Sequence, residues 1–281
     1  FHMKKLFYFF LALSVLPSCS SDNGTNSNDP GHRMLLIGNS FFRPYAEHLN
    51  TVSMEVGFTE HNATVVTRGG ANGWAISFWN DSTIASHQEI KMAFDGGGVE
   101  YFGMTSGSSP DNRTEGFREW IQYGLQQNPD MKVFISIPPI DFPSNWTDTA
   151  QYFGFSSIES FYDYFVNTII HKTVVDPLRS EFPNTSIFTI PIGWAAIELV
   201  KMREDGQLLD SIDFSGPKAS SLFTDTKGHQ GQIIIEAGTL MWMNGIYNMD
   251  LNSSAYQTGF NTDLHGLADQ IMGNHDTLYK Q

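Results

Sequence analysis

The chain has 281 residues, of which 41% are hydrophobic and 16% charged, so its length allows one large domain or two small ones with a full core. Its formal net charge of −14 disfavours nucleic acid and anionic membranes as partners, because phosphate binding needs a basic face. The single cysteine, Cys19, excludes an intrachain disulfide.

The first 19 residues have the pattern of a secretory signal. Lys4 and Lys5 precede an apolar run at 6–16, which is too short to span a membrane. The ending Leu16-Pro-Ser-Cys19 resembles the bacterial lipobox. That resemblance implies lipidation of Cys19 and anchoring in the bacterial cell envelope, on the periplasmic side or the outer surface. A plain secretory signal cut nearby is the alternative.

Residues 20–31 are mainly Ser, Asn, Asp and Gly, with almost nothing apolar. Such a stretch buries too little surface to order itself, so we expect a flexible tether. No later linker is long enough to separate two domains. We therefore expect a single globular domain over 32–281.

From residue 33 onward, short apolar runs alternate with stretches of helical periodicity. The expected strands are Met34–Ile37, Ala63–Thr67, Val99–Thr105, Lys132–Ile137 and Ile187–Ile190. The expected helices are Pro44–Val56, Ile84–Phe94, Thr114–Gln127, Ile158–Arg179 and Gln230–Tyr247. This alternation predicts an α/β protein with a parallel sheet between two helical layers, in a three-layer, flavodoxin-like arrangement with right-handed crossovers.

The chemistry of the chain is predicted to centre on Ser40, in Gly38-Asn39-Ser40. The residue lies between the first strand and the first helix, where open α/β sheets place their ligands. A serine there can attack a carbonyl group and stabilise the oxyanion with its own N–H. An ordinary helix-capping serine is the alternative.

A second group of polar residues, Asp225-Thr-Lys-Gly228-His229, precedes the last helix. Histidine titrates near neutrality, so His229 is suited to take the proton of Ser40 and return it to a leaving group. Asp225 would hold the imidazole tautomer and stabilise its cation. Taken singly, each residue also fits a capping or turn role.

The order of these blocks resembles the SGNH/GDSL hydrolase superfamily, whose serine lies in the first block and whose Asp and His lie together in the last. The resemblance covers about residues 33–248 and implies a Ser-His-Asp esterase without metal or organic cofactor. The chain departs from the family in the last block, where three residues rather than two separate Asp225 from His229. Either Gly228 absorbs the extra residue, or Asp213 is the acid.

The family's oxyanion hole combines the serine N–H, a glycine N–H after the second strand and an asparagine side chain after the third. Here Gly70 is the expected glycine, with Gly69 as the alternative. The expected asparagine after the third strand is missing. The third donor could instead be the hydroxyl of Thr105 or Ser106, or the side-chain amide of Asn72 or Asn112.

Four residues are expected to contact the substrate: Arg68, Trp74, Asp141 and Trp146. Trp146 belongs to an aromatic insert at about 141–165, which is expected either to cap the pocket as a sugar-stacking platform or to form core of its own.

The expected activity is hydrolysis of acyl esters, with O-acyl groups on carbohydrate as the first choice of substrate by analogy with the family. The expected partners are small-molecule or polysaccharide esters. The only expected contact with a membrane is through the lipid anchor. A non-catalytic glycan-binding lipoprotein and a structural surface lipoprotein are the alternatives.

Overall fold

The computed structural model describes residues 30–281. The predicted signal peptide, the lipidation site Cys19 and most of the predicted tether lie outside these residues. The last two residues of the predicted tether already contact the domain. The carbonyl of Pro30 accepts the N–H of Glu60, and Gly31 is buried.

All five predicted strands of the central sheet are confirmed. They are β1 (Arg33–Gly38), β2 (Asn62–Thr67), β3 (Tyr101–Thr105), β4 (Lys132–Ser136) and β5 (Ile187–Ile190). They run parallel in the order β2-β1-β3-β4-β5, which is the flavodoxin-like order. The strand order reverses between β1 and β3, so the loops that leave these two strands flank the point where such folds bind ligands.

Most of the predicted helices are also present. They are α1 (Arg43–Glu55), α3 (Ala85–Asp95), α4 (Phe117–Gln127) and α9 (Gln232–Tyr247). The helix expected at 158–179 is a continuous rod of α6 (Ile158–Tyr164), the π-helical η3 (Phe165–Val175) and α7 (Asp176–Glu181). Helix α4 begins three residues later than expected because Gly116, with φ of 83°, is left-handed and ends the preceding turn.

Four helices were not predicted: α2 (Ala75–Asn80), α5 (Trp146–Tyr152), α8 (Gly193–Glu204) and α10 (Leu264–Asn274). A small two-stranded sheet of β6 (Asp213–Ser215) and β7 (Ser221–Phe223) was missed as well. The short turns are η1 (Gly70–Gly73), η2 (Pro143–Asn145), η4 (Leu251–Ser253) and η5 (Thr277–Tyr279). Helix α10 packs on α9, so the domain extends past residue 248, where the family resemblance ends.

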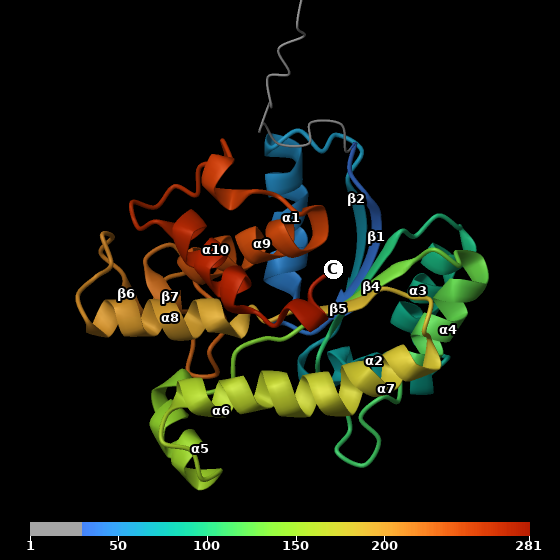
Figure 1. Ribbon diagram of the computed structural model, residues 1–281, viewed down its shortest axis with the longest axis horizontal. Helices are drawn as coiled ribbons and strands as arrows, with labels where there is room; N and C mark the ends of the chain where they lie inside the picture. Colours follow the sequence, from blue (N-terminus) through green and yellow to red (C-terminus); the bar gives the residue numbers. More distant parts are fainter. Residues whose placement is uncertain (1–29) are drawn as a thin grey trace, which may run out of the picture.

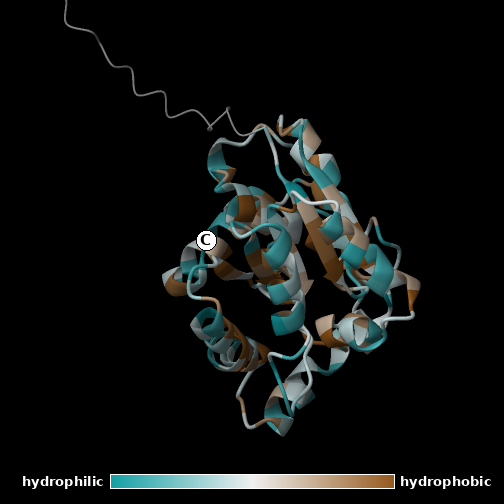
Figure 2. Cartoon of the chain, turned by 90° about the vertical axis from the view of Figure 1, so that its right-hand side faces the viewer, coloured by the Kyte–Doolittle hydropathy of each residue, from teal (hydrophilic) through white to brown (hydrophobic). Residues whose placement is uncertain are grey.

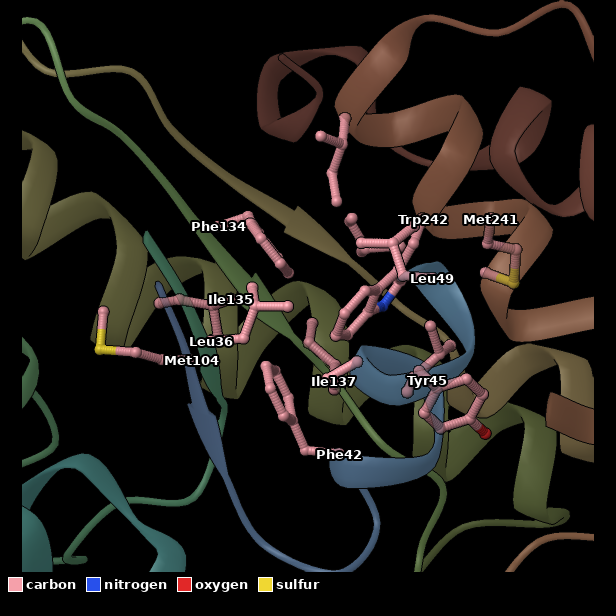
Figure 3. Close-up of a cluster of buried hydrophobic side chains, with 14 of the residues drawn as sticks. Leu36, Phe42, Tyr45, Leu49, Met104, Phe134, Ile135, Ile137, Met241 and Trp242 are labelled. Atoms are coloured by element: carbon pink, nitrogen blue, oxygen red, sulfur yellow. The ribbon is translucent and has the colours of Figure 1, made fainter. Parts of the chain in front are cut away.

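The sheet lies between two helical layers. Helices α1 and α9 pack together on one face, and α3 and α4 lie on the other (Figure 1). Apolar residues colour the strands in the interior, whereas the outer helix faces are largely hydrophilic (Figure 2). Figure 3 shows Trp242 of α9 between Tyr45 and Leu49 of α1 and the strand residue Phe134. Its indole N–H also donates to Ser136 Oγ over 3.2 Å, which links α9 to the end of β4.

Three buried histidines make the domain sensitive to acid. Burial lowers the pKa of His61 to about 4, of His171 to about 3 and of His275 to about 4. Each histidine is therefore neutral in the folded state at pH 5, whereas the unfolded chain binds protons below about pH 6.5. Stability is full above that pH and falls as the pH drops from about 6.5 to the folded-state pKa, which is about 4 for His61 and His275 and about 3 for His171, by up to about 1.4 kcal/mol per pH unit for each histidine.

We expect the free energy of unfolding, measured by denaturant titration, to decline steadily from pH 7.5 to pH 5. The substitution His171→Phe keeps an aromatic ring against Tyr279, on which His171 stacks at 3.6 Å, and should reduce the slope with pH. Equal free energies of unfolding at pH 7.5 and pH 5 would contradict this account.

No helix within residues 30–281 combines the length and the apolar character that crossing a membrane requires.

Candidate active site

Ser40 lies in the tight connection between β1 and α1. The carbonyl of Asn39 accepts the N–H groups of Phe42 and Arg43, which starts the helix directly after the serine. Glycine is required at position 38, because a Cβ there would lie 2.4 Å from the Phe42 ring. No described residue accepts the backbone N–H of Ser40. The serine therefore presents both a hydroxyl and a free N–H at the carboxyl end of β1.

The loop between β7 and α9 closes on itself and holds His229. The N–H of Thr224 donates to the carbonyl of His229 over 2.7 Å, and Phe223 pairs with Gln230 in an antiparallel bridge. Gly228 has φ of 99°, a conformation that glycine adopts readily. This turn accommodates the additional residue between Asp225 and His229. Asp213, the alternative acid, lies in β6, and no described contact joins it to His229.

Ser40, His229 and Asp225 form one chain of hydrogen bonds, although Ser40 and His229 are 189 residues apart. Ser40 Oγ lies 2.8 Å from His229 Nε2, and His229 Nδ1 lies 2.5 Å from Asp225 Oδ2. An ionised carboxylate only accepts hydrogen bonds, so Nδ1 carries the proton and its N–H donates a hydrogen bond to Asp225. Nε2 is then free to accept the Ser40 hydroxyl, which is the arrangement that general-base catalysis needs.

Asp225 is itself held in place by its own loop. Its Oδ1 accepts the N–H of Gly228 over 3.0 Å and that of His229 over 3.2 Å. Partial burial raises the pKa of Asp225, but the hydrogen bonds from His229 and Gly228 outweigh it and lower the pKa overall. The carboxylate is therefore ionised at neutral pH, in the form that orients an imidazole.

The ring of Phe41 packs on the face of the His229 imidazole and helps to fix its orientation. Its buried ring stacks on His229 with centroids 4.9 Å apart. The Lys227 ammonium lies 5.7 Å above the centre of the same ring. The connection between β1 and α1 thus supplies both the serine and the aromatic ring that packs on the histidine.

A pocket of about 310 Å³ opens at the loop that carries Ser40, although Ser40 and His229 are not themselves among the residues that line it. Its wall includes Asn39 and Phe41, the two neighbours of the serine in sequence. Its apolar lining is Phe41, Ala71, Trp74, Pro138, Pro139, Ile140, Phe165 and Ile170. Its charged lining is Arg113, Asp141 and Lys227. The volume suits a small acyl group or a single sugar unit rather than a large ligand.

Three of the residues expected in the oxyanion hole line this pocket: Gly70, Thr105 and Ser106. Gly70 has φ of 55° and opens the turn η1, so its N–H has no partner within that turn. The backbone N–H of Ser106 donates to the carbonyl of Ser136, which leaves only its hydroxyl for a ligand. Asn72 and Asn112 are exposed and are not part of the pocket wall, so their positions do not fit this role.

Two of the four residues expected to contact the substrate line the pocket, namely Trp74 and Asp141. Asp141 lies 3.8 Å from the Lys227 ammonium, and burial raises its pKa. Arg68 is not part of the wall, and its charge acts on Asp81 instead. The prediction for Trp146 is wrong, because its ring is buried and packs edge-on against Phe223, while its indole N–H donates to the carbonyl of Ile140.

Asn39 and Arg113 are among the pocket residues that sequence reasoning missed. Asn39 Oδ1 accepts the N–H of Phe41 over 3.0 Å, and no described residue accepts a hydrogen bond from its Nδ2. The position of Asn39 next to Ser40 was the available signal. Arg113 has no carboxylate partner among the described residues, and nothing in its sequence context set it apart.

The described residues contain no group of three or more His, Cys, Asp or Glu side chains arranged to hold a metal ion. No family model matches the chain, and no curated protein matches it. One solved structure with a detectable likeness is the periplasmic domain of a lipopolysaccharide acetyltransferase from Salmonella ser. Paratyphi A. The two chains are 14% identical, with a TM-score of 0.36 over 58% of this chain and 67% of that chain. A TM-score this low does not establish a common fold.

Proposed function

We propose that this protein is a serine esterase of the SGNH/GDSL type. The observation that carries the proposal is the hydrogen-bonded chain from Ser40 Oγ through His229 to Asp225, with distances of 2.8 and 2.5 Å. A nucleophile, a base and a group that orients the base, each within hydrogen-bond reach of the next, are the signature of covalent acyl transfer.

The first half of the reaction transfers the acyl group to Ser40. The Oγ attacks the ester carbonyl carbon while His229 Nε2 takes its proton, and the carbonyl oxygen becomes an oxyanion. The imidazolium that forms is stabilised by Asp225. When the tetrahedral intermediate collapses, His229 returns the proton to the departing alcohol, and the acyl group remains bound to Ser40 through an ester bond.

The second half releases the acid. A water molecule attacks the acyl-enzyme carbonyl and gives its proton to His229 Nε2. The proton then returns to Ser40 Oγ as the second tetrahedral intermediate collapses, so the carboxylic acid leaves and the enzyme regains its starting form. No further co-reactant is consumed.

The oxyanion hole is assigned to three donors: the N–H of Ser40, the N–H of Gly70 and the side-chain amide of Asn39. Asn39 replaces the asparagine that the family resemblance leads one to expect after the third strand. The Phe41 N–H holds Asn39 Oδ1, which fixes the amide and leaves the two Nδ2 hydrogens for a ligand. Donors fixed before the reaction stabilise the developing charge without reorganisation. The hydroxyls of Thr105 and Ser106 are the competing assignment.

The first choice of substrate is an O-acyl group, such as acetyl, on a carbohydrate. The apolar side of the pocket, with Trp74 and Phe165, suits a short acyl chain or the face of a sugar. The choice of carbohydrate rests on the family analogy and not on the triad geometry. We further propose that the protein is a lipoprotein of the bacterial cell envelope, anchored through Cys19 by the predicted signal.

The proposal is tested by labelling and turnover on the purified protein. A fluorophosphonate probe should modify Ser40, as located by peptide mass spectrometry, and p-nitrophenyl acetate should be hydrolysed. A wild-type protein that neither takes the label nor turns over any aryl ester would overturn the esterase proposal and favour a non-catalytic role.

A further inference from the structure

A set of contacting aromatic rings, three of them exposed, lies on the segment between β4 and β5. Five rings of α5, α6 and the turn between them touch in series: Tyr152, Phe153, Phe161, Phe155 and Tyr164. Neighbouring ring centroids lie 4.9 to 5.4 Å apart. We call this set the aromatic ladder. Figure 1 shows α5 at the outer edge of the molecule, next to α6.

The ends of the aromatic ladder are open to solvent. Tyr152 is 84% exposed, Phe153 56% and Tyr164 40%, whereas Phe161 in the middle is buried. One face of Phe153 lies flat on Phe161, so much of its exposed surface belongs to the opposite face. Core packing does not account for rings in this state, and exposed apolar clusters on a folded protein commonly mark a binding surface.

The charges around the aromatic ladder limit what it can bind. The segment 141–165 contains four acidic residues, Asp141, Asp148, Glu159 and Asp163, and no lysine or arginine. An anionic membrane or an anionic polymer would be repelled by such a surface. An uncharged polymer is not repelled. The axial C–H groups of a neutral sugar carry a slight positive charge and pack favourably on the negative face of an aromatic ring.

In sequence, the aromatic ladder adjoins the wall of the proposed active site. Tyr164 at its end is followed directly by Phe165, which lines the pocket beside Ser40. At the other end of the segment, Asp141 lines the same pocket, and the next residue, Phe142, is 49% exposed. The backbone N–H of Phe142 donates to the carbonyl of Lys227, in the loop that carries His229. Both ends of the segment that carries the ladder are therefore attached to the wall of the pocket.

We propose that the aromatic ladder binds a neutral polysaccharide chain and holds it so that one ester-bearing sugar enters the pocket. This inference rests on the proposed esterase function for the meaning of the pocket, while the binding itself is separate. On this proposal the ladder holds the polymer, and the pocket, which is sized for one sugar unit, takes only the ester-bearing sugar. It also assigns to Tyr152 and Phe153 the sugar-stacking role that was expected of Trp146, whose ring is buried in the core.

The test uses the inactive Ser40→Ala protein in gels that contain konjac glucomannan, acetylated xylan or polygalacturonate. We expect both neutral polymers to slow its migration and the anionic polymer to leave it unchanged. Adding Tyr152→Ala and Phe153→Ala should weaken binding roughly tenfold or more, because two ring contacts are lost. The matched control adds Met92→Ala and Leu209→Ala, which are 66% and 72% exposed on other elements and should leave binding intact.

Three outcomes would overturn the inference: equal retardation with and without the two rings, binding to phosphatidylglycerol vesicles in place of glucomannan, or a dimer that the Tyr152 and Phe153 changes disrupt. The readouts separate this inference from the esterase proposal. With Ser40 restored, loss of the two rings should leave p-nitrophenyl acetate turnover unchanged and raise KM for acetylated xylan. Retardation without any turnover in the wild type would retain the ladder and refute the esterase.

Discussion

Replacing Ser40 with alanine should reduce kcat for p-nitrophenyl acetate by about 10⁴- to 10⁶-fold, the range found when the nucleophile of a serine hydrolase is removed. The substitution deletes the atom that forms the acyl-enzyme, and no other hydroxyl among the described residues bonds to His229 Nε2. Steady-state kinetics gives the change in kcat. A thermal melt shows whether the fold survives, as we expect for the loss of one oxygen on a half-buried side chain.

His229→Ala should cost about as much as Ser40→Ala, and the double variant little more, because the two residues act as one unit. The exposed Ser82, whose hydroxyl makes no hydrogen bond among the described residues, gives the control Ser82→Ala, which should keep full activity. If Ser40→Ala retained more than a tenth of the wild-type kcat, the hydrogen-bonded chain from Ser40 to Asp225 would be a structural feature and not a catalytic one.

Asn39→Asp should lower kcat by about 100- to 1,000-fold, the usual cost of losing one oxyanion donor. The change is nearly isosteric, and a carboxylate oxygen still accepts the N–H of Phe41, so the turn before α1 keeps its bond. What changes is the other end of the side chain, where an acceptor with negative charge replaces the Nδ2 donor. The measurement is kcat and KM on the same aryl ester. We expect the loss in kcat with KM nearly unchanged, because the oxyanion exists only in the transition state and the intermediates.

Two further variants isolate the role of Asn39. Asn39→Ala removes both the donor and the bond to Phe41, so it should lose melting temperature as well as rate. Thr105→Val removes the competing hydroxyl and keeps the shape of a side chain that is fully buried at the end of β3. Full activity in Asn39→Asp together with a hundredfold loss in Thr105→Val would move the third donor to Thr105.

The strands were predictable because each is a short apolar run buried on both faces, which produces a strong local signal. Helices α1, α3, α4 and α9 were found because apolar residues recur at helical spacing. Helix α8 was missed because its first turns are apolar and its charged residues gather toward its end, so no helical period stands out in its sequence. Helix α5 was missed because it is only seven residues long and lies in a segment dense in aromatic residues, which fits a loop or a buried segment as well as a helix.

Trp146 shows the limit of reasoning about the site from residue type. The sequence shows which residues of the insert are aromatic, but it does not show which of these rings contact the substrate. Which ring is buried depends on contacts with β7, where Phe223 lies against Trp146 at 5.8 Å. In the same way, the role of Asn39 as a donor depends on two tertiary features: the Phe41 N–H binds its Oδ1, and the residue lines the pocket.

The amino-acid sequence determined the parallel sheet, most of its helices and the two segments, around Ser40 and around His229, where reactive side chains are concentrated. These properties are local, since they depend on apolar period, turn residues and residue type. The tertiary structure decided what depends on distance between remote segments: the pairing of Ser40 with His229, the choice of Asp225 over Asp213, and which polar groups line the pocket. Such distances are set by how β7 and α9 pack against the sheet that contains β1, and no local pattern encodes them.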